Sequence, residues 1–217
     1  MSESEIRKIV CNTAKQLLAD GLVVRTWGNV SFRLDEEHMI ITPSGKLYDK
    51  LEPEDMVLVN LKTSKAVGKH KPSSESDMHA AIYRNRKNIR VVIHTHQENA
   101  SIVAACRREV PAIFDDQVQL LGPSVRVTNY APSNTKKLVK EVLKALKGRN
   151  AALIANHGAV CIGRDMKEAY TATLLLEKTC KAFIEGEFLG QVKTIHKFQA
   201  RLMHEFYLRK YSKEAEK

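Results

Sequence analysis

The sequence predicts a single α/β domain, residues 1–217, in which helices flank a mainly antiparallel sheet. Three observations lead to this fold class. Segments with helical periodicity are interleaved with short β-like runs along the whole chain. No linker-like stretch, internal repeat or low-complexity segment divides it. Its 217 residues, 43% of them hydrophobic, also suffice for one domain with a real core.

The N-terminal third begins with an expected helix at 4–20. Ile6, Val10 and Leu17 fall on one helical stripe, and Gly21 follows as the natural residue after a helix end. Turn-rich pieces then separate short runs with β propensity. These predicted strands are 29–34, 39–42 and 56–61.

The middle third predicts a helix, a strand and a second helix. Ser74, with Asp77 three residues later, is close to a capping box, so a helix is expected from Ser74 to about Arg86. The apolar run at 90–94 predicts a buried strand. Residues 97–107 are expected to form the next helix.

The C-terminal third predicts two further strands and three helices. A helix should span 133–147, with Ser133 as its N-cap and Gly148 as its terminator. The other expected elements are strands at 151–155 and 159–162, a long helix from 165 to about 185 and a charged helix from 194 to about 211.

The chain has no predicted membrane span or secretory signal. It contains no stretch of about 18 or more uncharged apolar residues, so no spanning helix is expected. Residues 1–9 alternate charged and apolar types and lack the basic start, apolar run and cleavage site of a signal peptide. The prediction is therefore a cytoplasmic protein without a membrane partner.

The cysteines are predicted to be buried and reduced. They lie far apart in the sequence in apolar contexts, and no CxxC pair occurs. The residues are Cys11, Cys106, Cys161 and Cys180.

A net charge of +10 raises the question of an anionic partner. The positive residues are scattered in pairs such as Arg107-Arg108 and Lys136-Lys137. Aromatic residues make up only 6% of the chain and do not interleave with basic clusters as stacking platforms would. A solvated surface is the simplest interpretation, a small phosphorylated substrate the next, and a nucleic-acid partner is not expected.

Three histidines at predicted strand ends are candidate metal ligands. His94 and His96 flank Thr95 at the end of an apolar strand, where residues two apart point the same way. His157 precedes Gly158 in a tight turn between two strands, and glycine lets the backbone fold sharply there. Taken singly, each would more often be an unrelated surface or loop histidine. Three imidazoles with an open fourth position, however, are typical of a catalytic zinc site.

A polar segment at the predicted start of a helix is a second candidate site. Ser73 and Ser74 offer two hydroxyls beside free backbone N–H groups, which suits a phosphate or carboxylate. Glu75 follows and could act as a general base or bind a metal. The alternative for this segment is a plain helix N-cap with a glutamate that the helix dipole favours.

Two further turns combine glycine with hydroxyl or amide donors. They run from Thr26 to Ser31 and from Thr42 to Gly45. Such turns bind anions through backbone N–H groups, but they also occur as ordinary hairpin connections. Neither turn is specific by itself.

These motifs become specific when their order is considered. The order is Gly28–Ser31, Thr42–Gly45, Pro72–Glu75, His94–His96 and Asn156–Gly158. Together they resemble the class II aldolase/adducin family, and within it the L-fuculose-1-phosphate aldolases. The similarity covers roughly residues 5–190 with matching spacing between the blocks.

The resemblance implies a three-layer α/β/α fold with an antiparallel central sheet. It also implies a four-fold symmetric homotetramer with active sites between neighbouring subunits. Zn²⁺ would be bound by His94, His96 and His157, with Glu75 as fourth ligand when substrate is absent. The substrate phosphate would be bound by Thr26, Asn29, Ser44, Gly45, Ser73 and Ser74.

The activity implied by the resemblance is zinc-dependent cleavage of a ketose 1-phosphate similar to L-fuculose 1-phosphate. The products would be dihydroxyacetone phosphate and an aldehyde, and Glu75 would shuttle a proton. The sequence departs from the fuculose-phosphate aldolases at one point, because Asp115 stands where those enzymes carry a tyrosine supplied across the subunit interface. Asp115 is therefore a candidate acid/base residue, and the pair Asp115-Asp116 could instead be an acidic helix start. Tyr207 and Tyr211 are possible substitutes for the tyrosine.

Two alternatives remain within the family. The first is an L-ribulose-5-phosphate 4-epimerase, which the turns Thr26–Asn29 and Pro43–Gly45 resemble. Those epimerases carry aspartate at the position of Glu75 and have extra sequence between the metal motifs, which this chain lacks. The second is a lyase, such as a decarboxylase or dehydratase, that acts on phosphorylated sugar acids.

A function of another class is a non-catalytic interaction module. The adducin head shares the fold within a cytoskeletal scaffold and would lack the zinc histidines. The presence of all three histidines and of Glu75 makes the enzyme the preferred prediction.

Overall fold

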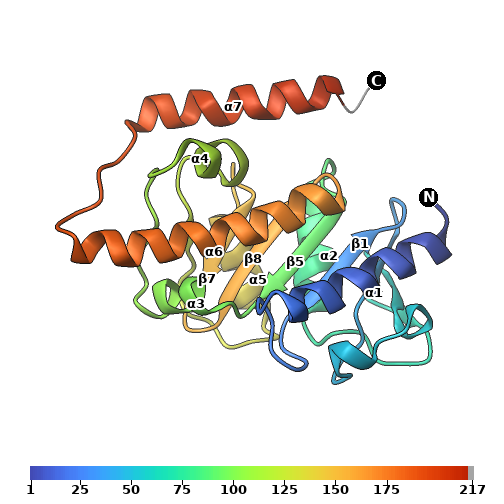
Figure 1. Ribbon diagram of the computed structural model, residues 1–217. Helices are drawn as coiled ribbons and strands as arrows, with labels where there is room; N and C mark the ends of the chain where they lie inside the picture. Colours follow the sequence, from blue (N-terminus) through green and yellow to red (C-terminus); the bar gives the residue numbers. More distant parts are fainter. Residues whose placement is uncertain (215–217) are drawn as a thin grey trace.

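A computed structural model describes residues 1–214 and contains one eight-stranded sheet between layers of helices (Figure 1). The strand order is β4-β3-β2-β1-β5-β8-β7-β6. The strands are β1 (Asn29–Arg33), β2 (His38–Ile41), β3 (Val57–Asn60), β4 (Ala66–Val67), β5 (Val91–Thr95), β6 (Arg126–Val127), β7 (Ala151–Ile154) and β8 (Gly158–Gly163).

Seven α-helices and two short 3-10 helices surround this sheet in the described part of the chain. The α-helices are α1 (Glu3–Ala19), α2 (Ser76–Asn85), α3 (Glu98–Ala105), α4 (Asp115–Leu121), α5 (Lys136–Ala145), α6 (Met166–Phe188) and α7 (Lys197–Glu214). The 3-10 helices are η1 (Tyr48–Lys50) and η2 (Pro53–Asp55). None of the described helices is long and apolar enough to cross a membrane.

The sheet is antiparallel except where β6 pairs with β7. Its centre is the ribbon of β1, β5 and β8, because β5 pairs with β1 on one side and with β8 on the other. The register places His94 opposite Asn29 on β1 and Val160 on β8. The mainly antiparallel sheet is as predicted, and it fixes the ends of three strands at one edge.

The two faces of the sheet are covered by different helices, which gives the predicted α/β/α layers (Figure 1). Successive strand residues point to opposite faces. Thus Val92 packs in the cluster that includes α2 and α5, whereas Val91 and Ile93 pack with α1 on the other face. Helices α3, α4 and α6 continue this second layer over β7 and β8.

Helix α7 lies outside these layers and packs against α4 (Figure 1). The connecting segment 189–196 carries Ile195, which joins a small apolar cluster with Val118 of α4 and Ala200 of α7. The imidazole Nδ1 of His204 donates a hydrogen bond to the carbonyl oxygen of Gln119 at 2.8 Å. The C-terminal helix is thus held mainly through α4, with a further hydrogen bond from Tyr207 to Glu168 of α6 at 3.2 Å, rather than by the sheet.

The structure corrects two predicted helix starts. Helix α2 begins at Ser76 and has Glu75 at its N-cap position, so Ser74 is not the cap. Backbone pairing of Ser73 with Thr42 keeps this stretch out of the helix. Helix α5 is capped by Thr135 rather than by Ser133, and the Thr135 side chain accepts a hydrogen bond from the N–H of Leu138.

Five short elements and one cysteine environment also differ from the sequence predictions. The two-residue strands β4 and β6, the short helix α4 and the 3-10 helices η1 and η2 were not predicted, because each is too short to show a period. Helix α4 begins at Asp115 and has Asp115 and Asp116 in its first turn, and this position leaves the proposed acid/base role of Asp115 untested. Cys106 is exposed rather than buried, because it is the C-cap of α3.

Candidate metal centre

The three candidate histidines converge at one edge of the sheet. His94 lies in β5, His96 follows the end of that strand, and His157 lies in the turn between β7 and β8. Their ring centroids are 4.8–4.9 Å apart in each pair. One ligand nitrogen from each ring lies within 4.8 Å of those of the other two. A single metal ion could therefore contact all three imidazoles.

The protonation of His94 is fixed by its neighbours. Its Nδ1 donates to the carbonyl oxygen of Ala159 at 2.8 Å, which directs Nε2 toward the other histidines. Burial disfavours the charged form of His94, but the nearby Glu75 carboxylate outweighs burial and raises the pKa of His94. Burial, assisted by the positive charge of His94, lowers the pKa of His96 to about 3. It also lowers the pKa of His157. His96 and His157 are thus neutral and offer free lone pairs.

Glu75 completes the cluster from the start of α2. Its Oε2 lies 3.0 Å from Nε2 of His94, and its Oε1 lies 3.7 Å from Nε2 of His157. Burial disfavours the charged carboxylate, but His94, His157 and a hydrogen bond from Asn29 outweigh it and hold the pKa of Glu75 well below its ordinary value. The Nδ2 of Asn29 donates that bond at 3.0 Å. Glu75 is therefore an ionised carboxylate only 8% exposed.

The donor set fits a divalent cation. Oε1 of Glu75 is buried and has no hydrogen-bond partner among the described residues, which is costly for a carboxylate oxygen. A cation bound by the histidines would satisfy it and would replace the proton shared by His94 and Glu75. Three nitrogens and one carboxylate favour zinc over magnesium or calcium.

A cavity of about 160 Å³ opens beside these ligands. Glu75, His96 and His157 line it on one side. The residues expected at the substrate phosphate line it as well, namely Thr26, Asn29, Ser44, Gly45, Ser73 and Ser74. The structure therefore brings the predicted metal ligands and the predicted phosphate ligands into one site, although they come from five separate segments.

Comparison with known families identifies this arrangement. Residues 8–184 match the family model described as Class II Aldolase and Adducin N-terminal domain. The chain belongs to the class II aldolase and adducin family. The family prediction is thus confirmed over most of the chain.

Similar proteins give the enzyme class. The chain is 33% identical over 190 residues to the 5-deoxy-D-ribulose 1-phosphate aldolase of Bacillus thuringiensis serovar kurstaki, covering 87% of this chain and 89% of that protein. It is 31% identical to the L-fuculose phosphate aldolase of Escherichia coli strain K12 over 78% of each chain. A solved L-fuculose 1-phosphate aldolase aligns with a TM-score of 0.90 and 30% identity, over 95% of this chain and 98% of that chain. The chain is accordingly an aldehyde-lyase, and the alternative of a non-catalytic module is set aside.

Two glycines allow close approach at the metal edge of this class II aldolase, which is the set of strand ends and the turn that carry Asn29, His94, His96 and His157. A Cβ atom at Gly158 would collide with the carbonyl oxygen of Thr95 and would lie 3.2 Å from the His96 ring. Glycine is therefore needed there for close approach, whereas the left-handed residue of the turn is Asn156 at φ 56°. Gly28 has φ 106°, and a Cβ there would lie 2.8 Å from the carbonyl oxygen of His94.

The site of the enzyme includes three residues that sequence reasoning missed. Trp27, Ser133 and Asn134 line the cavity together with the metal ligands. Trp27 is 58% exposed, which is unusual for an indole and marks it as a surface available to a ligand. The signal for Ser133 and Asn134 was hidden, because a serine before an amphipathic segment was interpreted as a helix cap.

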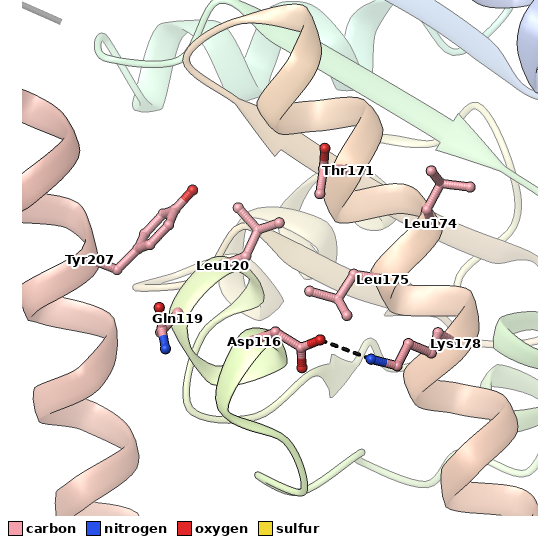
Figure 2. Close-up of a pocket in the computed structure, with 8 residues that line it drawn as sticks. All are labelled: Asp116, Gln119, Leu120, Thr171, Leu174, Leu175, Lys178 and Tyr207. Carbon is pink, nitrogen blue, oxygen red and sulfur yellow. Dashed lines mark hydrogen bonds and ion pairs between the residues drawn. The ribbon is translucent and has the colours of Figure 1, made fainter. Parts of the chain in front are cut away.

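Asp115 does not join this cavity within one chain of the enzyme. It is exposed at the first residue of α4. Its neighbour Asp116 turns toward α6 and forms an ion pair with Lys178 at 2.9 Å (Figure 2). Figure 2 shows this pair near Leu175, in a groove between α4, α6 and α7 whose opposite side carries Tyr207, and this groove shares no lining residue with the metal cavity. The side chain of Tyr211 lies outside the described part of the structure.

His79 lies behind the site of the enzyme, one turn after Glu75 on α2. It is fully buried, and its Nδ1 lies 2.7 Å from the hydroxyl of Ser31, which in turn contacts the hydroxyl of Tyr83 at 2.8 Å. Burial lowers the pKa of His79 to about 3. His79 is thus a neutral core residue.

Proposed function

We propose that the enzyme is a zinc-dependent aldolase that cleaves a small ketose 1-phosphate to dihydroxyacetone phosphate and an aldehyde. The observation that carries the proposal is the single cavity lined by Glu75, His96, His157 and the six predicted phosphate ligands. The names of the similar proteins, which include 5-deoxy-D-ribulose 1-phosphate and L-fuculose phosphate aldolases, support a ketose 1-phosphate as substrate.

The phosphate is held by neutral donors. Among the described residues that line the cavity there is no lysine or arginine. The hydroxyls of Ser44, Ser73 and Ser74 and the backbone N–H groups around Gly45 supply hydrogen bonds, and the start of α2 adds the positive end of its helix dipole. Binding the phosphate at this end orients the reacting carbons toward the histidines.

Glu75 performs the proton transfer in this proposal. The ionised Glu75 carboxylate accepts the proton of the substrate C4 hydroxyl as the C3–C4 bond breaks, so that C4 becomes the aldehyde carbonyl and the electron pair of the broken bond stays on C3. A zinc ion bound by the histidines would supply a Lewis acid for the negative charge that develops. The protonated Glu75 carboxyl then delivers that proton to C3. Its two carboxylate oxygens face His94 and His157, and Glu75 also lines the cavity. This position suits a carboxylate that leaves the metal when the substrate binds.

The candidate acid/base residue Asp115 does not reach the cavity of its own chain. We propose a homotetramer with active sites between subunits, in which Asp115 of one subunit reaches the cavity of its neighbour. The exposure of Asp115 and its absence from the cavity of its own chain support this arrangement. A location in the cytoplasm remains part of the proposal.

Release of dihydroxyacetone phosphate tests the proposal. L-Fuculose 1-phosphate and 5-deoxy-D-ribulose 1-phosphate are offered in parallel, with and without a chelator. Release that the chelator abolishes and zinc restores is the expected result, and the better substrate defines the aldehyde accepted. No release from zinc-loaded protein with either substrate would contradict the aldolase. Epimerisation of L-ribulose 5-phosphate would then be the next activity to measure.

A further inference from the structure

A second cavity, of about 690 Å³, lies at the other end of the second helix layer. It is bounded by the end of α6, the segment that leads to α7, the first turns of α7 and the loops before β6 and β7. It shares no lining residue with the metal cavity, and its volume is in the range of small-molecule sites. It is therefore a separate feature of the chain.

The lining of this cavity is strongly basic. Its cationic residues are Arg108, Arg126, Arg149, Lys197 and Arg201. Only two acidic residues, Glu109 and Glu187, oppose them among the described lining residues. Glu187 is already paired with Arg108 at 2.6 Å, and Glu109 accepts a hydrogen bond from Ser124. The cavity thus has a surplus of positive charge, in contrast to the metal cavity.

Arg149 is the unusual member of this group, because it is only 8% exposed. Its Nε and Nη2 donate to the carbonyl and hydroxyl oxygens of Ser124 at 2.8 Å, and its Nη1 donates to the carbonyl oxygen of Lys147 at 3.2 Å. All of these acceptors are neutral, and no carboxylate lies within 4.0 Å of Arg149 in the described part of the chain. Buried cations in proteins are normally neutralised, and Arg149 retains two unused N–H donors.

Arg126 increases the imbalance. Its guanidinium makes only long contacts of 3.5 Å to the carbonyl oxygens of Lys144 and Lys147. Burial, together with the charge of Arg126, lowers the pKa of Arg149, and Glu109 opposes this effect. Lys197, on the first turn of α7, has no ion-pair partner among the described residues. An anion bound between these groups would relieve the repulsion.

Apolar side chains line other parts of the same cavity. Val192 and Ile195 come from the segment before α7, and Phe183 comes from α6. A ligand that fits both parts must combine an anionic group with a larger, weakly polar body. A bare anion would leave most of the volume unfilled.

We propose that this cavity is a second ligand site that binds a phosphorylated organic molecule of nucleotide size, with its phosphate between Arg126, Arg149 and Lys197. The body of the ligand lies against Val192 and Ile195. Since Lys197 and Arg201 belong to α7 whereas Arg126 and Arg149 belong to the sheet side, the bound phosphate ties the C-terminal helix to the rest of the chain. This site does not depend on the proposed aldolase activity.

Isothermal titration of the zinc-loaded enzyme with ATP, without added magnesium, tests the proposal. Saturable binding is expected, and pyrophosphate should bind more weakly because it lacks the organic body. The double variant Arg126→Ala/Lys197→Ala should weaken ATP binding at least tenfold. The matched control Lys87→Ala/Lys140→Ala removes the same charge from exposed positions outside the cavity and should stay within twofold. Absence of saturable binding, or an equal loss in the control, would overturn the proposal.

Two further variants separate this site from the catalytic one. Lys197→Glu reverses one charge at an exposed residue, so it tests the site without disturbing the core, and it should weaken ATP binding more than Lys197→Ala does. Ser73→Ala/Ser74→Ala alters the phosphate ligands of the metal cavity and should leave ATP affinity within twofold. Loss of ATP binding in that variant would place the probe in the catalytic cavity and would overturn the second site.

Discussion

The metal edge and the C-terminal segment are built in opposite ways. The metal edge consists of the strand ends and the turn that carry Asn29, His94, His96 and His157, and the C-terminal segment comprises residues 189–214. At the metal edge, β5 is hydrogen-bonded on both sides, and His94 is fully buried. The C-terminal segment packs mainly on α4 and leaves Phe206 68% exposed.

The difference shows which part of this fold can keep catalytic side chains in fixed positions. His94 lies on a strand that is hydrogen-bonded on both sides, which holds its ring in a fixed position. Small chemical changes at the metal edge should therefore alter activity without altering the fold. Helix α7 is held by its packing on α4 and by a hydrogen bond from Tyr207 to Glu168 of α6, and it leaves Phe206 exposed, so its opening should cost less free energy than opening of the central strands. The largest effect is therefore expected at the metal edge and the smallest in the C-terminal segment.

Replacing a metal ligand should have the largest effect. His94→Ala is expected to lose bound zinc and to reduce release of dihydroxyacetone phosphate by at least about a thousandfold, because the Lewis acid is lost. Metal analysis and the release assay measure both effects. His196→Ala, at an exposed histidine outside the cavity, should retain full zinc. Full metal occupancy in His94→Ala would remove this residue from the ligand set.

Glu75→Gln should separate chemistry from metal binding. The amide is of the same size but cannot move a proton, so zinc should stay bound while kcat falls roughly 100-fold or more. Circular dichroism and zinc content serve as checks that the edge is intact. Glu36→Gln, an exposed control, should match the wild type. Wild-type turnover in Glu75→Gln would show that another group carries the proton.

The metal edge was largely predictable from sequence for a physical reason. Side chains alternate along a strand, so His94 and His96 were expected to point the same way although β5 ends at Thr95. The alternation of helices and strands likewise predicted a sheet flanked by helices. The choice of His157 and of the full ligand set, however, depended on the order of the five motifs along the chain.

The remaining features depend on contacts that a local pattern does not contain. Ser74 and Ser133 looked like helix caps, but pairing with a distant strand and a better cap at Thr135 moved both helix starts. The position of Ser133 in the cavity follows only from tertiary packing. The role proposed for Asp115 requires a neighbouring subunit, and it was suggested by the resemblance to the family rather than by a local pattern.

Removing one phosphate ligand should have a smaller effect than removing the proton carrier. Ser74→Ala is expected to raise KM about tenfold with little change in kcat, since one hydrogen bond to an anion is lost. Steady-state kinetics with the better ketose 1-phosphate measure it. Ser76→Ala, two residues further on and outside the lining of the metal cavity, is the matched control. A fall in kcat without a change in KM would mean that Ser74 acts on the reacting carbons instead.

The smallest effect concerns the C-terminal segment and arises from His204. Burial lowers the pKa of this imidazole, so the unfolded chain binds its proton more readily than the folded chain. The contribution of neutral His204 to stability is therefore present above the ordinary histidine pKa of about 6.5 and is lost as the pH falls below it. The positive charges of Arg86 and Arg149 act in the same direction.

His204→Asn isolates this contribution, because the amide can still donate to the carbonyl oxygen of Gln119 but does not titrate. Thermal unfolding at pH 7 and pH 5 should show a smaller acid destabilisation in the variant than in the wild type. The difference should be a few degrees, since 1 kcal/mol corresponds to roughly 2–4 °C for a chain of this size. His196→Asn should behave like the wild type. Equal pH dependence in all three proteins would mean that the titration of His204 does not contribute to stability. The attachment of α7 would then not depend on this buried histidine.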